Sequence, residues 1–495
     1  MENTNFANRE TDNYGDLEMV QSLTHKTLQI TPISSITSEF ADKEVLVRGR
    51  ISNSRVKGNL AFLVVREGIH SVQSVAFKSE TITKDMLKFI EGITKESIID
   101  VYGKLVKTKN EVKTCSVKDL ELAISKVFVL SRADVNLPFQ LEDAMRKINN
   151  FENEEEEEKK EENALPTVSL KNRLDNRIID MRTPLTQSIF RIQSGVCRFF
   201  RDYLHSQDFM EIHTPKLLAG SSEGGSNVFK FNFFKREGCL AQSPQLYKQM
   251  CIMGDFKRVF EIGPVFRAEN SFTPRHLCEF TGLDFEMEIQ ESYLEVLEVI
   301  GNLFNHIFKN LKEHYTKELS CINEVYPFED FKYLEKPLIL TFEEGCKLLK
   351  EHGIEQSVHE DLDTVNEKTL GKLVREKYNT DFYILHRYPE SARPFYTMLQ
   401  KDDERFTCSY DVFMRGQEII SGAQRIHVPE LLEKRAIAKG LQVESIKSYI
   451  DSFKFGASPH GGVGVGLERV VMLFTGLPSC KLTSLFPRDP KRLTP

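Results

Sequence analysis

The chain has 495 residues, 40% of them hydrophobic, and a formal net charge of −7, which is typical of a globular protein with two or three domains. The sequence does not open on basic residues followed by an apolar run, and no stretch approaches the ~20 apolar residues of a membrane helix, so we expect a cytoplasmic protein without membrane contact. Nine cysteines are spread singly without a CxxC pair, which excludes a locally encoded zinc site or disulfide framework.

The first domain predicted from the sequence is a small β-barrel. Residues 1–28 are acidic and Asn-rich, and we expect a flexible extension there. From Val45 to Leu130 the chain has five β-rich runs, with an apolar helix-like segment from Met86 to Ile93 after the third. This order is that of an oligonucleotide-binding (OB) fold, which we assign to residues 29–135.

A hinge and acidic linker are expected over residues 136–182. The run from Glu152 to Glu162 holds eight glutamates and two lysines, and a segment so charged cannot bury a core. A functional acidic segment is the alternative interpretation. We assign the second domain to residues 183–495.

The second domain is predicted to open on a long amphipathic helix from Thr186 to Ser206, because apolar residues recur there at helical spacing. Phe199 and Phe200 give this helix more apolar surface than one face is expected to cover. The next segment, FMEIHTPKL, is predicted to be a strand that contains Pro215, which suits an edge or an interface.

A hairpin with one charged face is predicted from GPVFRAENSFTPR, which starts at Gly263, and EFTGLDFEMEI. In its second strand Leu283 and its alternate neighbours form an apolar face, whereas Asp284 points the other way. Arg267 and Glu269 share a face and are expected to meet Asp284 across the hairpin. Charges concentrated in this way favour the lining of a ligand cleft over a salt-bridged surface hairpin.

Near the end of the sequence, GGVGVGLERVVMLF combines a glycine-alternating strand with a helix. Glycines at every second position clear one face of the strand, so that a flat ring can lie against the backbone. A dinucleotide fingerprint would need a βαβ unit and an acidic residue ~20 positions later, and no P-loop is present.

Together these motifs resemble those of the class II aminoacyl-tRNA synthetases, and FRAE with FTGLDFEM resembles the aspartyl-tRNA synthetases of the eukaryotic and archaeal type in particular. GLER resembles motif 3 of that class, and the helix followed by a segment with Pro215 resembles motif 1, its dimer element. The resemblance implies an α+β fold: an OB barrel for the anticodon and a catalytic domain built on an antiparallel sheet flanked by helices.

The resemblance also implies an ATP site. Arg267 would hold the α-phosphate and the substrate carboxylate, while Phe280 and Arg469 would sandwich the adenine, since a guanidinium can both stack and carry charge. The implied catalytic residues are Arg267, Arg469 and Glu418. The implied ATP-binding residues are Arg267, Glu269, Arg275, His276, Leu277, Phe280, Glu418, Gly466, Leu467, Glu468 and Arg469.

An aspartate site is implied by SSEGGSNVF, AQSPQLYKQ and SGAQR, which match further segments of the aspartyl family. Arg425 is expected to hold the substrate β-carboxylate with Lys248 nearby, and Asp284 and Glu223 to hold its ammonium. The implied aspartate-binding residues are Ser222, Glu223, Gln245, Lys248, Arg267, Asp284, Ser421, Gln424 and Arg425.

Magnesium and tRNA contacts are implied as well. Hard cations that bridge phosphates need carboxylate oxygens, so Mg²⁺ is assigned to Glu418, Ser421 and Asp411. The barrel residues matching the family's anticodon contacts are Arg55, Phe62, Gln73 and Glu121, where stacking and edge hydrogen bonds read single-stranded bases. Ser271 and Thr273 are assigned to the acceptor end.

The function implied by the resemblance is ATP-dependent ligation of L-aspartate to tRNA(Asp) by a homodimer, through an aspartyl-adenylate. Two alternatives remain open. An asparaginyl-tRNA synthetase or amidating paralogue would share FRAE and GLER, and a non-catalytic RNA-binding scaffold could keep the fold. Lys248 and Arg425 count against the first, and the intact arginines against the second.

Overall fold

The fold is taken from a computed structural model that describes residues 6–22, 28–148, 165–220, 228–441 and 443–495. The chain forms two compact units, Met1–Met145 with Ile178–Gln187 and Arg146–Arg177 with Ser188–Pro495. The acidic run from Glu152 to Glu162 lies outside the described residues.

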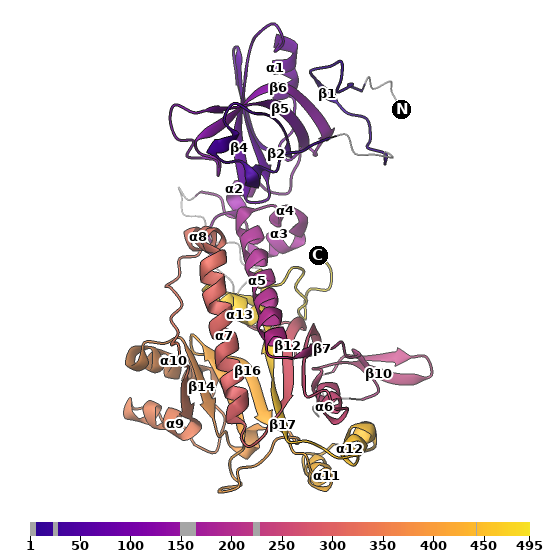
Figure 1. The fold of residues 1–495 in the computed structure, drawn as a ribbon, viewed down its shortest axis with the longest axis vertical. Coiled ribbons are helices and arrows are strands. Elements are labelled where there is room, and N and C mark those ends of the chain that lie inside the picture. The colour runs from indigo at the N-terminus through magenta and orange to yellow at the C-terminus, as the bar shows by residue number, and fades with distance from the viewer. Residues whose placement is uncertain (1–5, 23–27, 149–164, 221–227, 442) are drawn as a thin grey trace. The chain divides into compact units, whose positions relative to one another are not determined.

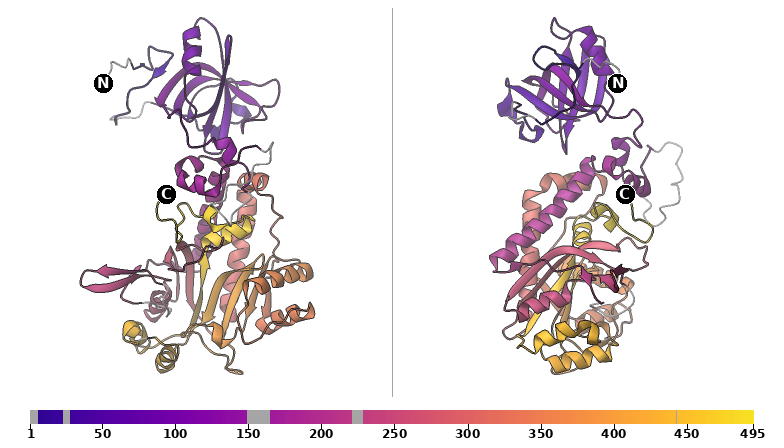
Figure 2. Two further views of the ribbon diagram at one scale, coloured as in Figure 1. Left: turned by 180° about the vertical axis from the view of Figure 1, so that it is seen from behind. Right: turned by 90° about the vertical axis from the view of Figure 1, so that its right-hand side faces the viewer.

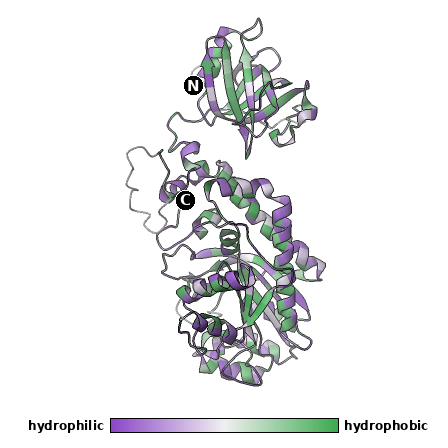
Figure 3. Ribbon diagram, turned by 90° about the vertical axis from the view of Figure 1, so that its left-hand side faces the viewer, coloured by the Kyte–Doolittle hydropathy of each residue, from purple (hydrophilic) through white to green (hydrophobic). Residues whose placement is uncertain are grey.

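The first unit is a closed β-barrel, as the sequence predicted (Figures 1 and 2). Its elements are β2 (Glu44–Lys57), β3 (Leu60–Glu67), β4 (His70–Phe77), α1 (Lys84–Glu91), β5 (Ile98–Lys107) and β6 (Leu120–Ser131). Strand β5 pairs with both β2 and β6, and the parallel pairing of β6 with β4 closes the ring. The barrel forms because apolar residues alternate with more polar ones along its strands (Figure 3). The inward-facing apolar residues make one buried cluster.

The N-terminal segment pairs with this barrel. Strand β1 (Tyr14–Asp16) lies parallel to β6, and Arg9 forms an ion pair with the buried Asp100. The expectation of a flexible extension over residues 1–28 therefore does not hold for residues 14–16, which backbone pairing fixes, or for Arg9, which a buried carboxylate binds.

The second unit is built on a mixed sheet (Figure 1). Its strands, in sheet order, are β13 (Leu338–Thr341), β14 (Phe382–His386), β15 (Ser409–Met414), β16 (Gln417–Gln424), β17 (His460–Gly466), β12 (Glu279–Glu288), β11 (Arg258–Phe266) and β7 (Met210–Glu211). The outer pairs β13 with β14 and β7 with β11 are parallel, and the pairs between them are antiparallel. A small separate sheet contains β8 (Leu217–Leu218), β10 (Arg236–Leu240) and β9 (Lys230–Phe233).

Helices cover this sheet. The expected long helix is α5 (Pro184–Ser206), and it lies beside α7 (Leu294–His314), with Phe199 against His306. Phe199 and Phe200 are buried in their own unit, so the expected surplus of apolar surface is absent from these two side chains. Helix α9 (Phe342–Glu351), which begins with a Thr341–Glu344 capping box, and α10 (Thr364–Tyr378) pack near β13 and β14 around a core of their own.

The remaining helices have at most ten residues each. They are α2 (Leu141–Ala144), α3 (Leu170–Asp175), α4 (Arg177–Asp180), α6 (Gln245–Met253), α8 (Thr316–Val325), α11 (Pro429–Ala438), α12 (Lys447–Phe453), α13 (Leu467–Phe474) and α14 (Cys480–Thr483). Four 3₁₀ turns occur among the described residues, at Ile33–Ser35, Ser38–Phe40, Glu390–Ala392 and Val443–Ile446.

Pro215 does not lie within a strand, and that prediction was wrong. The strand ends at Glu211 and another begins at Leu217, with the proline exposed between them. A proline cannot donate to a ladder, and its neighbours instead bind Glu261, through the backbone N–H and hydroxyl of Thr214 and the ammonium of Lys216.

The hairpin of β11 and β12 has the predicted strands but not the predicted pairing. Asp284 lies opposite Glu261, so Arg267, which follows β11, does not face it across the ladder. Strand β11 ends at Phe266, so Arg267 lies in the loop between the strands. Its N–H donates there to the carbonyl of Cys278. The register places Asp284 deeper in the sheet than Arg267.

Candidate active site

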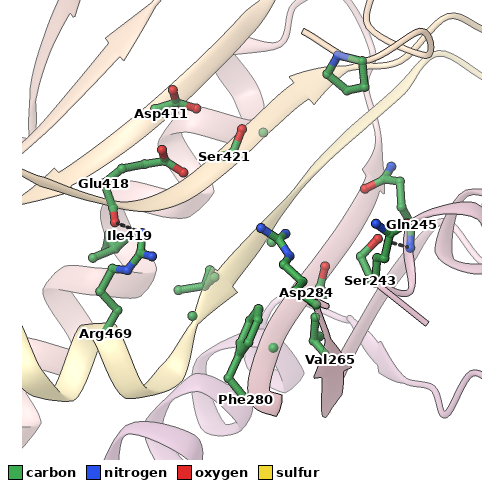
Figure 4. Close-up of a pocket in the computed structure, with 18 of the residues that line it drawn as sticks. Ser243, Gln245, Val265, Phe280, Asp284, Asp411, Glu418, Ile419, Ser421 and Arg469 are labelled. Carbon is green, nitrogen blue, oxygen red and sulfur yellow. Dashed lines mark hydrogen bonds between the residues drawn. The ribbon is translucent and has the colours of Figure 1, made fainter. Parts of the chain in front are cut away.

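A cavity of about 620 Å³ lies over β11, β12, β16 and β17 and collects most of the predicted site residues (Figure 4). The predicted residues that line it are Gln245, Arg267, Glu269, Arg275, His276, Leu277, Phe280, Asp284, Asp411, Glu418, Ser421, Arg425, Gly466, Glu468 and Arg469. They come from segments that range from Gln245 to Arg469, which the central position of β17 brings together.

The glycines of β17 make room for these side chains. A Cβ at Gly462 would come within 2.1 Å of the Phe285 carbonyl oxygen and 2.3 Å of the Glu286 carboxylate, and one at Gly464 within 3.1 Å of Asp284. At Gly466 the nearest atom is 3.8 Å away, on Arg469. Two of the glycines therefore accommodate carboxylates of β12, and the flat, open surface is confined to Gly466.

One end of the cavity is a network of buried charges. Lys248 donates to Asp284 (3.0 Å) and to the Val463 carbonyl (2.7 Å), while Arg425 binds both oxygens of Glu286 (2.8 and 3.2 Å). The hydrogen bonds of Arg425 with described residues use Nε and Nη2, which leaves Nη1 available for a ligand. Pairing makes it possible to keep so many charges out of water.

The same contacts set the ionisation of the two acids. Burial raises the pKa of Asp284 above its ordinary value, and Lys248 opposes that effect. Burial alone would also raise the pKa of Glu286, but Arg425 and Lys248 outweigh it and lower that pKa. Glu286 is thus an anion whose charge is matched by two cations.

Two predicted aspartate-binding side chains do not line the cavity. Gln424, the last residue of β16, is not among the residues that line the cavity. Lys248 is buried below the lining, where it supports Asp284 and Glu286. Ser222 and Glu223 lie outside the described residues.

At the other end, Arg267 lies over the Phe280 ring, with 5.6 Å from its guanidinium carbon to the ring centre. Its Nε is buried and has no hydrogen-bond partner among the described residues. A buried donor without a partner costs free energy, which a ligand oxygen would recover. The Gln245 amide nitrogen is in the same condition.

Arg469, from the first turn of α13, connects this end to the rest of the cavity. It donates to the Glu418 carbonyl (2.8 Å) and the Arg275 carbonyl (3.3 Å), and Arg275 in turn pairs with Glu367 of α10 (3.1 Å). Burial and the neighbouring arginines lower the pKa of His276. The neighbouring Glu468 is buried and accepts a hydrogen bond from the Thr281 N–H, and burial raises its pKa to about 7.

Side chains whose oxygen atoms could ligate a metal ion lie together on β15 and β16 (Figure 4). Asp411 lies opposite Ser421, and the irregularity between Val412 and Phe413 lets Glu418, three residues before Ser421, share its face. Both oxygens of Asp411 bind Arg393 (2.7 and 2.9 Å). Burial and the charge of Asp411 raise the pKa of Glu418.

The remaining predicted residues lie at the edge of the cavity or away from it. Ser271 and Thr273 contact the His276 ring from the loop after β11 (3.2 and 2.5 Å). Leu467 is buried in α13 and does not line the cavity.

On the barrel, the four predicted anticodon residues share one face. Arg55 lies opposite Phe62, which is opposite Val75, two residues from Gln73. Phe62 is 38% exposed, so it is not a core residue, and Gln73 donates to Glu121 (3.0 Å).

Sequence reasoning missed Arg393 and Glu367, which line the cavity, and Glu286, which is buried and binds Arg425. Glu286 had a signal, since it alternates with Asp284 on the charged face of β12. Arg393 and Glu367 had none, because each reaches the cavity from a segment whose pattern carries no recognisable chemistry.

Comparisons with known proteins agree with this geometry. Residues 169–490 match the family model of class II tRNA synthetases (D, K and N), and residues 45–130 match that of the OB-fold nucleic acid binding domain. The chain therefore belongs to the class II tRNA synthetases.

Within that class, it belongs to the aspartate–tRNA ligase family. It is 51% identical to the cytoplasmic aspartate–tRNA ligase of Caenorhabditis elegans, covering 98% of this chain and 91% of the relative, and 49% identical to that of Homo sapiens, covering 98% and 95%. The solved aspartyl-tRNA synthetase of Entamoeba histolytica is 45% identical with a TM-score of 0.88, covering 98% and 97%. Among the described residues, no helix has the length and apolar content to span a membrane.

Proposed function

We propose that the protein ligates L-aspartate to tRNA(Asp) in a reaction that consumes ATP. The observation that carries the proposal is a single cavity with two unlike ends. One end holds a buried guanidinium, Arg425, with an available nitrogen, and the other holds Arg267, with an unpartnered donor, above Phe280. A small dicarboxylate suits the first end and a nucleotide suits the second.

The reaction needs no nucleophilic side chain. The aspartate α-carboxylate attacks the α-phosphorus of ATP, the bond to the β-phosphate oxygen breaks, and pyrophosphate leaves. A terminal ribose hydroxyl of the tRNA then attacks the aspartyl carbonyl, and AMP leaves. Positioning and stabilisation of developing charge are what the protein supplies.

For aspartate, Arg425 binds the β-carboxylate through Nη1, and Asp284 binds the ammonium. Lys248 acts from below: it holds Asp284 and, with Arg425, balances the charge of Glu286. Asparagine would leave Nη1 of Arg425 without an anionic partner, and unpaired buried groups of this kind support strong discrimination.

For ATP, the adenine stacks between Phe280 and Arg469 over the open surface at Gly466. Arg267 donates its unpartnered Nε to the α-phosphate. His276 and Arg275, on the loop after β11, also line the cavity and are assigned to ATP, and Arg469 approaches its terminal phosphate.

The oxygen donors of Glu418, Asp411 and Ser421 fit Mg²⁺, a hard cation that prefers carboxylate and hydroxyl oxygens. Among the described residues, no group of three or more acidic, His or Cys side chains is arranged to hold a metal on its own, which suits an ion that is completed by substrate phosphates. Bound there, Mg²⁺ would neutralise charge on the phosphates.

We assign the anticodon to the barrel face with Phe62, Gln73 and Glu121, and the chemistry to the domain over residues 183–495. The acceptor end would pass Ser271 and Thr273. We also propose a homodimer that uses the segment around Pro215, where Met210 and Leu217 are exposed large apolar side chains.

Pyrophosphate exchange into ATP tests the proposal. With purified protein, exchange should depend on L-aspartate and be absent with L-asparagine. Exchange that is supported equally by asparagine would overturn the assignment of Arg425 to the β-carboxylate of aspartate.

A further inference from the structure

Glu367 lines the cavity, yet neither the sequence patterns nor the reaction assigns it a role. It lies in the first turn of α10, a helix that packs with α9, β13 and β14 outside the central strands. Its side chain is 12% exposed. Burial raises the pKa of Glu367, and Arg275 opposes that effect. A carboxylate removed from water to this extent needs a cation beside it.

That cation is Arg275, whose guanidinium is held by α10 at two points. Its Nη1 donates to the Glu367 carboxylate (3.1 Å), and its Nη2 donates to the hydroxyl of Thr364, the residue that follows the N-cap of α10. Within the described residues, the Arg275 side chain has no further hydrogen bond. An arginine has five N–H donors, so the two that α10 takes leave three for a ligand. The first turn of α10 therefore orients the guanidinium and leaves most of its donors free.

The backbone at Arg275 is held by other parts of the chain. Arg275 lies in a turn of the loop between β11 and β12. Its carbonyl accepts from Arg469 (3.3 Å), and the preceding Pro274 carbonyl accepts from the Cys480 N–H (2.8 Å). Loss of Glu367 would thus free the Arg275 side chain and leave the backbone of the turn in place. A freed side chain must be ordered again when a ligand binds, and this weakens binding.

The oriented guanidinium belongs to a cationic cluster at the nucleotide end of the cavity. After burial, the charges of Arg469, Arg275 and Arg267 lower the pKa of His276, so these charges lie close together. Among the described residues, Arg275 is the one of the three arginines that is hydrogen-bonded to a carboxylate. The phosphates of ATP are the anionic ligand that suits such a cluster.

We propose that Glu367 is a positioning residue which, together with Thr364, holds the Arg275 guanidinium in the orientation that receives the phosphates of ATP. Glu367 acts through Arg275 and not by contact with a substrate. This inference rests on the proposed function, since it takes ATP as the nucleotide.

Calorimetric titration of the full chain with a non-hydrolysable ATP analogue tests the inference, together with pyrophosphate exchange. Glu367→Ala should weaken binding of the analogue and raise the ATP KM by about three- to tenfold, since ordering one freed arginine on binding costs that much. The aspartate KM should stay the same. Unchanged affinity for the analogue overturns the inference. Tighter binding also overturns it, because Glu367 would then compete with the phosphates for Arg275.

Arg275→Met shows whether Glu367 acts through Arg275. In a protein that already carries Arg275→Met, Glu367→Ala should cause no further loss of affinity for the analogue, because the side chain that it positions is gone. Losses that multiply in the double variant would mean that Glu367 acts on the nucleotide by another route, and the inference would be wrong.

Glu318→Ala is the matched control. Glu318 also lies in the first turn of a helix, α8, its side chain is 11% exposed, and it pairs with an arginine, Arg191. Its removal should change neither KM. If Glu367→Ala fails to fold, Thr364→Val decides, since Thr364 is exposed and supplies the second contact with Arg275.

Thr364→Val should weaken binding of the analogue by about twofold, and unchanged binding would overturn the inference. A wild-type protein that binds the analogue but shows no aspartate-dependent exchange would overturn the proposed function, and the titrations would still test Glu367. A wild-type protein that binds no analogue overturns both.

Discussion

Arg425 connects substrate recognition to the internal stability of the site. Its guanidinium binds Glu286, and we assign its remaining nitrogen to the β-carboxylate of aspartate. Arg425→Ala should weaken aspartate binding by ~2–5 kcal/mol, because a desolvated charge pair loses one partner, while ATP affinity stays nearly constant. The KM values for both substrates in the exchange assay measure this.

A control separates recognition from damage to the network. In Arg425→Ala/Glu286→Gln the buried anion is removed together with its partner, so the protein should regain stability without regaining aspartate affinity. A normal aspartate KM in either variant would contradict the role of Arg425.

Glu468 should make stability depend on pH in a direction that is unusual for a carboxylate. Its folded pKa is raised to about 7 by burial, from an ordinary value of 4.5, so between these values the folded state holds a proton that the unfolded state has lost. Stability therefore falls as pH rises from 4.5 to 7, by ~3 kcal/mol in total. Glu468→Gln removes this loss and can still accept the Thr281 hydrogen bond.

Thermal unfolding of the wild type and Glu468→Gln at several pH values measures the effect. The variant should be the more stable protein at pH 8, and the two should converge near pH 5. A constant difference between them across this range would show that Glu468 is ionised in the folded protein throughout.

Among the elements, the barrel should act on tRNA and not on the first chemical step. Phe62 of β3 is exposed on the face shared with Gln73, and removal of a stacking ring should cost ~1–3 kcal/mol. Phe62→Ala should lower the rate of tRNA charging and leave exchange without tRNA unchanged. Phe6→Ala, which removes another exposed ring of the same unit, is the control, and a parallel fall in exchange would assign Phe62 to stability instead.

Elements with strong periodicity were predictable from the sequence, and register was not. The barrel strands and α5 are fixed by local alternation or helical spacing, which the sequence displays directly. The pairing of Asp284 with Glu261 depends on the length of the loop after β11. The interruption of the strand at Pro215 depends on the hydrogen bond that the neighbouring Thr214 hydroxyl donates to Glu261. Such contacts join segments far apart in the chain, and single-segment patterns do not contain them.

The same distinction holds for the site. Arg267, Phe280 and Arg469 lie in motifs with a recognisable resemblance, and they line one cavity. Gln424 was assigned from its place in SGAQR, but it is absent from the lining of the cavity. Arg393 lies in no such motif, and only the fold brings it to Asp411.

For the whole molecule, we predict a homodimer whose interface includes the segment around Pro215. Exposed apolar surface at Met210 and Leu217 supports this prediction. Phe199 and Phe200 of α5 do not, because they are buried within their own unit. Sedimentation at micromolar concentration should give twice the 57.0 kDa chain mass. A monomer with full exchange activity would refute the dimer and its coupling to catalysis.

We conclude that this chain attaches aspartate to tRNA(Asp). The most direct measurement is the charging of purified tRNA(Asp) with radiolabelled L-aspartate or L-asparagine, in the presence of ATP and Mg²⁺. We predict acid-precipitable aspartyl-tRNA that accumulates in proportion to the tRNA supplied, and no product with asparagine. Charging with asparagine, or no charging by a protein that binds both ATP and tRNA, would contradict the account.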